Sequence, residues 1–210
     1  GWLEACVTVG QAFGGDLEAV TVHTGLLAAR LVLEADLVVV AQGPGNLGTG
    51  TRWGFSGVAA GEAVNAAGVL GGRPVASLRV SGADARDRHL GVSHHSLTAY
   101  GRVALVPADV VVPDFGVGPM LGVPDADGVP PLEPGSLAAL GARVRHQAAS
   151  LGAPNGIHRL VEVPAGAELM TALATAPVRL ATMGRGLEDD PGSFLAAAAA
   201  GVHAAQLLED

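Results

Sequence analysis

The chain has 210 residues, a net charge of −8 and 49% hydrophobic residues, so it can bury a large core as one domain. Its 12 basic residues are all arginine, which excludes every mechanism that needs a lysine amine, including the P-loop, the kinase lysine and the pyridoxal Schiff base. The negative charge and only 3% aromatic residues argue against nucleic acid as a partner, and no apolar run approaches the roughly 18 residues of a membrane span.

Strand-like and helix-like segments alternate along the chain, a pattern typical of a parallel sheet. We predict strands at 5–9, 37–41, 74–80, 109–112, 159–163 and 178–181. We predict helices at 17–33, 57–70, 93–102, 136–150, 167–174 and 191–208, with Asp16, Ser56 and Asp190 as caps. The predicted fold class is therefore α/β, a mostly parallel sheet with helices on both faces in a three-layer sandwich.

A stretch rich in proline and glycine, residues 114–135, interrupts this pattern. We expect 1–113 to form the α/β core, 114–135 a linker or long surface loop, and 136–210 the remaining βα units of the same domain. The lone cysteine, Cys6, lies in the first predicted strand and has no disulfide partner, which favours a buried thiol in a reduced, cytoplasmic protein. The pattern does not decide the oligomeric state, so a homo-oligomer is left open.

The loop after the predicted strand 37–41 is rich in glycine. Glycine lets backbone amides converge on a ligand, and ligands bind at the carboxyl ends of strands in open α/β sheets. The loop therefore predicts a cradle for a phosphate, carboxylate or sugar, formed by Gly43, Gly45, Asn46, Gly48, Thr49, Gly50, Thr51 and Arg52.

The same loop matches the G-x-G-x-x-G pattern of dinucleotide-binding folds. In those folds a helix opens at the glycines, whereas here the next predicted helix begins only near residue 56. The following strand ends near Arg79 without an acidic residue, which would suit a 2′-phosphate. A NADP-dependent oxidoreductase is therefore one alternative, and a tight turn in a non-catalytic sensor or assembly domain is another.

A second candidate region spans residues 73–102, where five arginines face two aspartates in an otherwise acidic chain. It contains Ser93, His94 and His95, and histidine is the usual proton carrier near neutral pH. If the sheet is parallel, loops at one edge would bring Asp16, Arg79 and Arg185 to the same cleft. We expect His94, His95, Ser93 and Asp16 to supply catalytic groups and Arg79 and Arg185 to bind the ligand. Ser93 also fits a simple helix cap.

Adjacent histidines point about 100° apart on a helix, so we expect at most one of His94 and His95 to face a given ligand. A metal would need further ligands, for which Asp16, Asp84, Asp87 and His89 are available, but no spacing singles them out. We therefore predict no metal site, and the sequence indicates no particular cofactor.

Five longer motifs resemble one family: GGDLEA at 14–19, QGPGNLGTGT at 42–51, WGFSG at 53–57, VSHHSLT at 92–98 and MGRG at 183–186. Over nearly its whole length the chain resembles the uncharacterised bacterial family known as domain of unknown function 3866. Members of that family are longer at the amino end, and this chain begins without methionine directly before a strand pattern, so the resemblance implies a carboxy-terminal portion. The family has no established activity and implies no catalytic residue here.

These observations together predict a cytoplasmic protein that binds a small anionic metabolite at the glycine-rich loop and nearby arginines. Histidine acid–base groups beside the ligand would support a hydrolase- or transferase-like reaction. No nucleic acid or membrane partner is expected.

Overall fold

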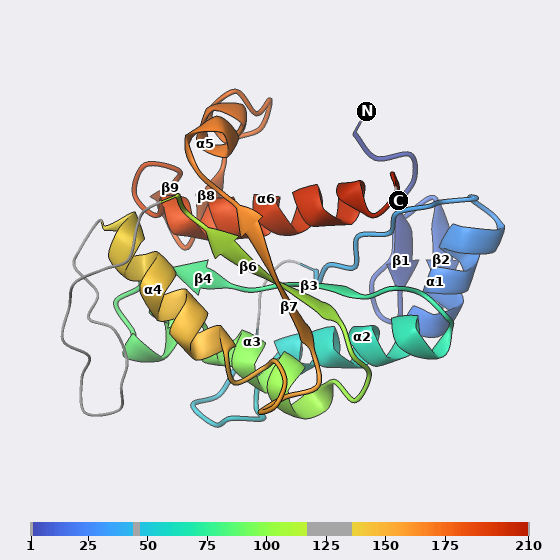
Figure 1. Cartoon of the computed structure of the whole chain (residues 1–210). Helices are drawn as coiled ribbons and strands as arrows, with labels where there is room; N and C mark the ends of the chain where they lie inside the picture. The colour runs from blue at the N-terminus through green and yellow to red at the C-terminus, as the bar shows by residue number, and fades with distance from the viewer. Residues whose placement is uncertain (1, 44–46, 117–135, 210) are drawn as a thin grey trace.

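A three-stranded parallel sheet lies at the centre of the computed structural model, which describes residues 2–43, 47–116 and 136–209 (Figure 1). Its strands are β3 (Val75–Ser77), β6 (Asp109–Asp114) and β7 (Arg159–Pro164), in the order β3-β6-β7. The register pairs Val75 with Asp109 and Val110 with Leu160. The mixed α/β class and the parallel sheet are thus as predicted. The finer prediction of a three-layer sandwich stays a prediction.

The central strand β6 is buried on both faces. Val110, Val111 and Val112 are at most 2% exposed, and successive side chains of a strand point to opposite faces. Helix α6 (Pro191–Gln206) packs against all three strands, and α4 (Leu137–Ala148) packs against β6. Such two-sided cover explains why the strand reads as a continuous apolar run.

Of the other helices, all but α1 lie close to their predicted positions. These other helices are α1 (Val22–Leu31), α2 (Ala59–Val69) after the 3₁₀ turn η1 (Ser56–Val58), α3 (His94–Thr98) followed by the π-helical turn η3 (Ala99–Val103), and α5 (Ala167–Ala174). Gly71, with φ of +80°, follows the end of α2, where a left-handed backbone favours glycine. Ser136 caps α4 through a hydrogen bond from the Ala139 amide. No helix among the described residues is long and apolar enough to cross a membrane.

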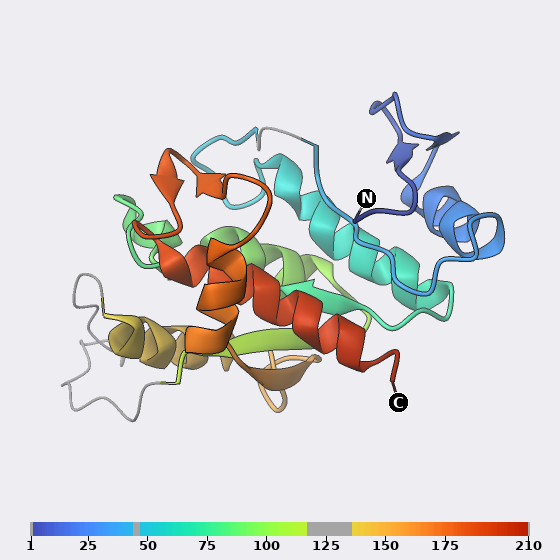
Figure 2. The same cartoon turned by 90° about the horizontal axis from the view of Figure 1, so that it is seen from above.

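The amino-terminal region differs from prediction. Strand β1 (Val7–Val9) pairs in parallel with β2 (Leu17–Ala19), and both pack on α1 at the end of the molecule beyond α2 (Figure 2). The predicted helix 17–33 therefore begins later, after a strand, and its cap is Thr21 rather than Asp16. The Asp16 carboxylate instead accepts the Cys6 amide, 2.8 Å away. Cys6 is exposed, so the prediction of a buried thiol is wrong.

The predicted strand at 37–41 is not formed. No described strand pairs with this segment, and its side chains stay in solvent, with Val39 75% and Val40 52% exposed. The predicted strand 178–181 is replaced by a small hairpin of β8 (Ala181–Thr182) and β9 (Arg185–Gly186). An apolar run becomes a buried strand only if a neighbouring strand pairs with it, and residues 37–41 have no such partner among the described strands.

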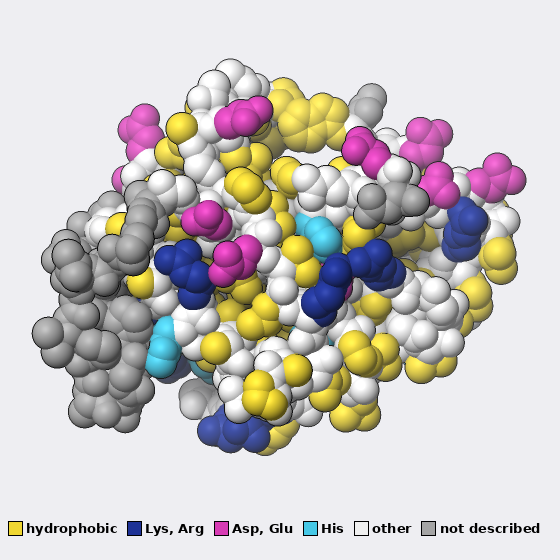
Figure 3. Space-filling model, viewed as in Figure 1, with side chains coloured by type: hydrophobic (Ala, Val, Ile, Leu, Met, Phe, Trp, Pro, Cys, Tyr) yellow, Lys and Arg dark blue, Asp and Glu magenta, His cyan; other side chains and the backbone are white. Residues whose placement is uncertain are grey.

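Asp109, the first residue of β6, joins several elements at the amino end of the sheet. Its carboxylate accepts from Arg159 of β7 at 2.6 Å, from His203 of α6 at 2.9 Å and from Nε of Arg73 at 3.2 Å. Figure 3 shows arginine and histidine side chains gathered near the middle of this face. Because the hydrogen bonds from Arg159 and His203 favour the ionised form, the pKa of Asp109 lies well below its usual range.

Candidate functional site

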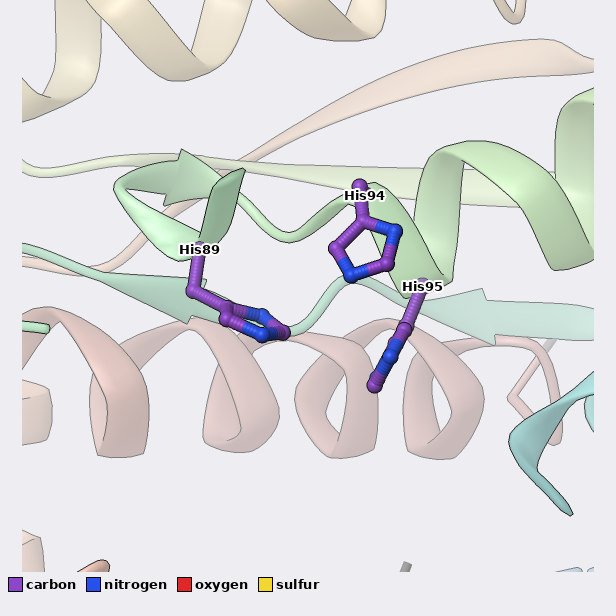
Figure 4. A group of neighbouring side chains, drawn as sticks. All are labelled: His89, His94 and His95. Carbon is purple, nitrogen blue, oxygen red and sulfur yellow. The ribbon is translucent and has the colours of Figure 1, made fainter. Parts of the chain in front are cut away.

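Three histidines from two turns meet beside the carboxyl end of β3. Strand β4 (Val80–Ser81) pairs antiparallel with β5 (Gly91–Val92), and the intervening loop contains the 3₁₀ turn η2 (Asp87–His89). Since β5 leads directly into α3, the hairpin places His89 beside the first residues of α3 (Figure 4). The ring centroid of His89 lies 4.9 Å from that of His94 and 5.0 Å from that of His95. The centroids of His94 and His95 lie 4.3 Å apart.

The surroundings of these rings fix their positions. His89 is 2% exposed, and its Nδ1 lies 2.8 Å from the hydroxyl of Ser93. The same hydroxyl accepts the amide of His95 and caps α3. The ring of Phe55 stacks on His95 at 4.0 Å with an interplanar angle of 9°. Nε2 of His94 is buried and has no hydrogen-bond partner among the described residues.

All three imidazoles are neutral at physiological pH. Burial lowers the pKa of His89 to about 4, and the nearby guanidinium groups of Arg86 and Arg79 act in the same direction. Burial also lowers the pKa of His95 to about 4, with further lowering by His94 and Arg79. The pKa of His94 is lowered too, first by burial and then by Arg88. The cluster therefore presents nitrogen lone pairs rather than positive charge.

A group of charged residues lies beside the imidazoles, and we call it the Arg79 group; its members are Arg79, Asp84, Arg86, Arg185 and Asp190. Arg86 holds Asp84 with two hydrogen bonds of 2.9 Å. Arg185 reaches Asp84 at 3.5 Å and Asp190 at 3.3 Å. The nearest carboxylate oxygen to the Arg79 guanidinium is that of Asp84, 3.9 Å away. Hydrogen bonding from Arg86 keeps the pKa of Asp84 well below its usual range.

Asp190 fastens this group to the rest of the fold. It precedes α6 as predicted, but its side chain does not cap that helix. It accepts the Ser81 hydroxyl at 2.5 Å and the Gly82 amide at 2.9 Å, which joins β4 to the start of α6. Asp190 is 2% exposed and fully engaged, so we assign it a structural role.

A cavity of about 310 Å³ lies along residues 77–80, which join β3 to β4, and is bounded on another side by α6. Thr182 of β8 and Ser193, Phe194 and Ala197 of α6 complete its lining. Arg79 belongs both to the cavity and to the charged group beside the histidines. The volume is at the lower end of the range for small-molecule sites.

A family model described as "Protein of unknown function (DUF3866)" matches residues 1–201. The chain belongs to the DUF3866 family. Searches of the curated proteins and of the solved structures found no match. The chemistry of this DUF3866 protein must therefore be argued from its own residues.

Several residues that the sequence singled out in the DUF3866 chain are neighbours. Ser93, His94 and His95 share one cluster, and Arg79 and Arg185 face the same carboxylate of Asp84. The end of the glycine-rich loop reaches the cluster as well, because Gly48 forms a bridge with Phe55, the residue that stacks on His95. Within that loop the hydroxyls of Thr49 and Thr51 lie 2.8 Å apart.

Other candidates are elsewhere. Asp16 bonds to Cys6 beside β2, and the β1–β2 sheet lies at the far end of the molecule from β4 (Figure 1). Arg52, Gly43 and Gly50 are exposed, while Gly45 and Asn46 lie outside the described residues. Ser56, predicted to cap a helix, accepts the Leu47 amide instead.

From the sequence, His89 was named only as one of several available metal ligands, and Phe55 was not a candidate. The sequence also predicts that His94 and His95 diverge, whereas their rings approach closely because both turn toward His89 at the first turn of a short helix (Figure 4). His89 reaches the cluster because Val80 pairs with Val92, which closes a loop that contains His89. Two-residue strands give too short an alternation to be recognised in advance.

Proposed function

We propose that this DUF3866 protein binds a small anionic metabolite between Arg79 and the histidine cluster and acts on it in a hydrolase- or transferase-like reaction. The observation that carries the proposal is the incomplete neutralisation of Arg79. The Arg79 side chain is 35% exposed, and its guanidinium makes no hydrogen bond to any described residue. The nearest carboxylate, that of Asp84, lies 3.9 Å away. Asp84 is already held by Arg86 at 2.9 Å.

The charge balance supports an anion as the ligand. The Arg79 group contains three guanidinium groups and two carboxylates, and the adjacent imidazoles are neutral. Burial lowers the pKa of Arg79, and the neighbouring Arg86 and Arg185 act in the same direction, whereas Asp84 opposes them. A phosphate or carboxylate would supply that charge and form bidentate hydrogen bonds with the guanidinium.

The neutral imidazoles support chemistry at the same place. An unprotonated nitrogen can accept a proton or bind a metal ion, and either activates a water or hydroxyl group beside a bound anion. The cavity at Arg79 has room for a small molecule. The sequence candidates His94, His95 and Ser93 are kept in this proposal, whereas Asp16 is not, because it lies in the β1–β2 lobe.

The NADP alternative is not proposed, because its structural context is missing. A dinucleotide fingerprint needs a strand before the glycines and a helix opening at them. Residues 37–41 are not a strand, and α2 begins only at Ala59.

The test is a thermal-shift screen with inorganic phosphate, pyrophosphate and a panel of phosphorylated and carboxylated metabolites. A ligand present at 100 times its Kd should stabilise the protein by about 2.7 kcal/mol. We expect Arg79→Ala to abolish the shift. Arg30→Ala, which removes an equal charge from an exposed ion pair with Asp36, should keep it. The proposal fails if no compound in the panel distinguishes the wild type from Arg79→Ala.

A further inference from the structure

The imidazole nitrogens of His89, His94 and His95 converge on one point in the fold. The three ligand atoms, one from each ring, all lie within 4.8 Å of one another. Figure 4 shows the three rings turned toward a common space, with His89 from η2 and the other two from the start of α3. From this convergence we propose that the three side chains hold one divalent transition-metal ion of the zinc class, with a fourth coordination position open.

The separation of the nitrogens suits such an ion after small ring rotations. A tetrahedral zinc with Zn–N bonds of about 2.0–2.1 Å places its nitrogens about 3.3 Å apart. Rotations about the two side-chain torsions can close the remaining gap, since His94 and His95 are only partly buried. Three histidines with an open position form a ligand set used by catalytic zinc sites, whereas closed structural sites have four protein ligands.

An unpartnered buried nitrogen supports the assignment. Nε2 of His94 is shielded from solvent and makes no hydrogen bond to any described residue. Leaving a buried polar atom unpaired costs about 1–3 kcal/mol, so such atoms in native folds call for a specific explanation. A metal bond to this nitrogen removes the cost.

The outer contacts of the cluster also match those of a metal centre. Metal-binding histidines generally hydrogen-bond through their second ring nitrogen, which fixes the ring and the tautomer. In His89, Nδ1 lies 2.8 Å from the Ser93 hydroxyl; when Nδ1 donates, Nε2 is left unprotonated for the metal. Phe55, 5% exposed, covers one face of the His95 ring and keeps water from that side.

The surrounding charges determine what occupies the fourth position. Imidazole ligands carry no negative charge and leave the dication uncompensated, and the neighbouring Arg79 group holds Arg79 and Arg86 around Asp84. This field opposes a bare cation and favours an anion bound to it. We therefore expect the anionic ligand of the proposed function, on which this part of the inference rests, to complete the coordination and to raise the affinity for the metal.

The competing explanation is a purely structural stack of neutral rings beneath Phe55. It predicts no metal uptake, and no difference in uptake between histidines inside and outside the cluster. The two explanations therefore separate in one titration.

The experiment uses the full chain, stripped with a chelator, and titrates it calorimetrically with Zn²⁺ alone and then spectroscopically with Co²⁺ alone. We expect one ion per chain and the visible absorption of tetrahedral Co²⁺. His94→Ala and His95→Ala should each weaken binding by at least about tenfold. His146→Ala, which removes an exposed histidine of α4, should leave it unchanged. His94→Gln serves as a second variant if an alanine variant fails to fold.

The inference is overturned if the stripped protein binds no ion, or if the cluster variants bind as tightly as His146→Ala. Its failure is distinct from that of the proposed function. Arg79→Ala should lose the anion-induced thermal shift yet still bind one Zn²⁺. Adding the anion to the wild type should tighten Zn²⁺ binding by the same factor by which Zn²⁺ tightens anion binding.

Discussion

At the scale of single residues, the hydroxyl of Ser93 has two structural duties. It accepts the His95 amide at 3.2 Å, which starts α3, and it lies 2.8 Å from Nδ1 of His89 in the preceding turn. Ser93 is 0% exposed, so water cannot replace either contact. One side chain therefore sets both the helix that carries His94 and His95 and the orientation of the third ring.

Replacing this serine tests the orienting role. Ser93→Ala should cost about 1 kcal/mol of stability through the lost cap. It should also weaken Zn²⁺ binding by about 10–100-fold, because the His89 ring loses its second contact. Ser136→Ala removes the corresponding cap of α4, away from the histidines, and should lower the unfolding free energy by a similar amount without changing the metal affinity. Calorimetry and urea unfolding of both variants provide the comparison, and equal metal affinities would argue against the orienting role.

At the scale of elements, α2 crosses η3 at a distance that only glycine permits. A Cβ on Gly61 would meet the Ala99 carbonyl oxygen and the Val103 side chain, and backbone atoms cannot move aside as a side-chain tip can. In the same contact, the Asn65 side chain donates to the Val103 carbonyl at 3.1 Å and accepts the Leu105 amide at 2.7 Å. Since η3 continues α3, this crossing supports the helix that bears two of the histidines.

Gly61→Ala should therefore be destabilising, although alanine is the better helix former. We expect a loss of about 1–3 kcal/mol from overpacking against the backbone of η3. Gly201→Ala in α6, where a Cβ would meet no atom within 4 Å, should instead gain up to about 1 kcal/mol from helix propensity. Denaturant unfolding should show a lower unfolding free energy for Gly61→Ala and a higher one for Gly201→Ala. A higher unfolding free energy in both variants would show that α2 can shift away from η3 at little cost.

Elements whose signals are local could be predicted from the sequence. Helix α5 has its predicted bounds, α4 begins one residue after its predicted start at 136, and β6 is recognisable as a continuous apolar run. Residues 37–41 carry the same apolar signal and stay exposed, because strand formation depends on a partner that the segment itself does not encode. At 17–19, predicted as the start of a helix, the sequence Leu-Glu-Ala has no strand signal of its own, and pairing with β1 makes it a strand.

The candidate site was predictable only in part, for a related reason. The arginines and the adjacent pair His94 and His95 stand out by composition and by residue type. The contribution of His89 arises from the antiparallel pairing of Val80 with Val92, and that of Phe55 from its bridge to Gly48. Contacts of this kind form when loops close in three dimensions, and the periodicity of the sequence does not predict such closure.

At the scale of the whole molecule, the Asp109 network closes the end of the sheet opposite the histidines. It joins β6, β7, α6 and the segment before β3 through one carboxylate, which is 6% exposed. Asp109→Asn keeps the shape but removes the charge that Arg73, Arg159 and His203 face. Because Arg159 is largely exposed, we expect a loss of about 2 kcal/mol at neutral pH, below the roughly 3–5 kcal/mol that breaking a fully buried ion pair costs.

The same network predicts how stability depends on pH. In the unfolded chain an aspartate titrates near 3.9, whereas hydrogen bonding from Arg159 holds the native pKa of Asp109 far lower. Above the unfolded value both states are ionised and the contribution is complete. As the pH falls below about 4, the unfolded chain takes up the proton first and gains stability, so the contribution declines until the native carboxyl is protonated as well.

The measurement is the difference in unfolding free energy between wild type and Asp109→Asn, followed by urea titration from pH 7 to pH 3. We expect the difference to be steady down to about pH 5 and to shrink below about pH 4. Asp36→Asn, in the exposed pair with Arg30, should show little difference at any of these pH values, since surface pairs contribute at most about 1 kcal/mol. A difference that instead grew toward pH 3 would mean that the native pKa is raised, and that Asp109 is not the counter-ion closing this end of the sheet.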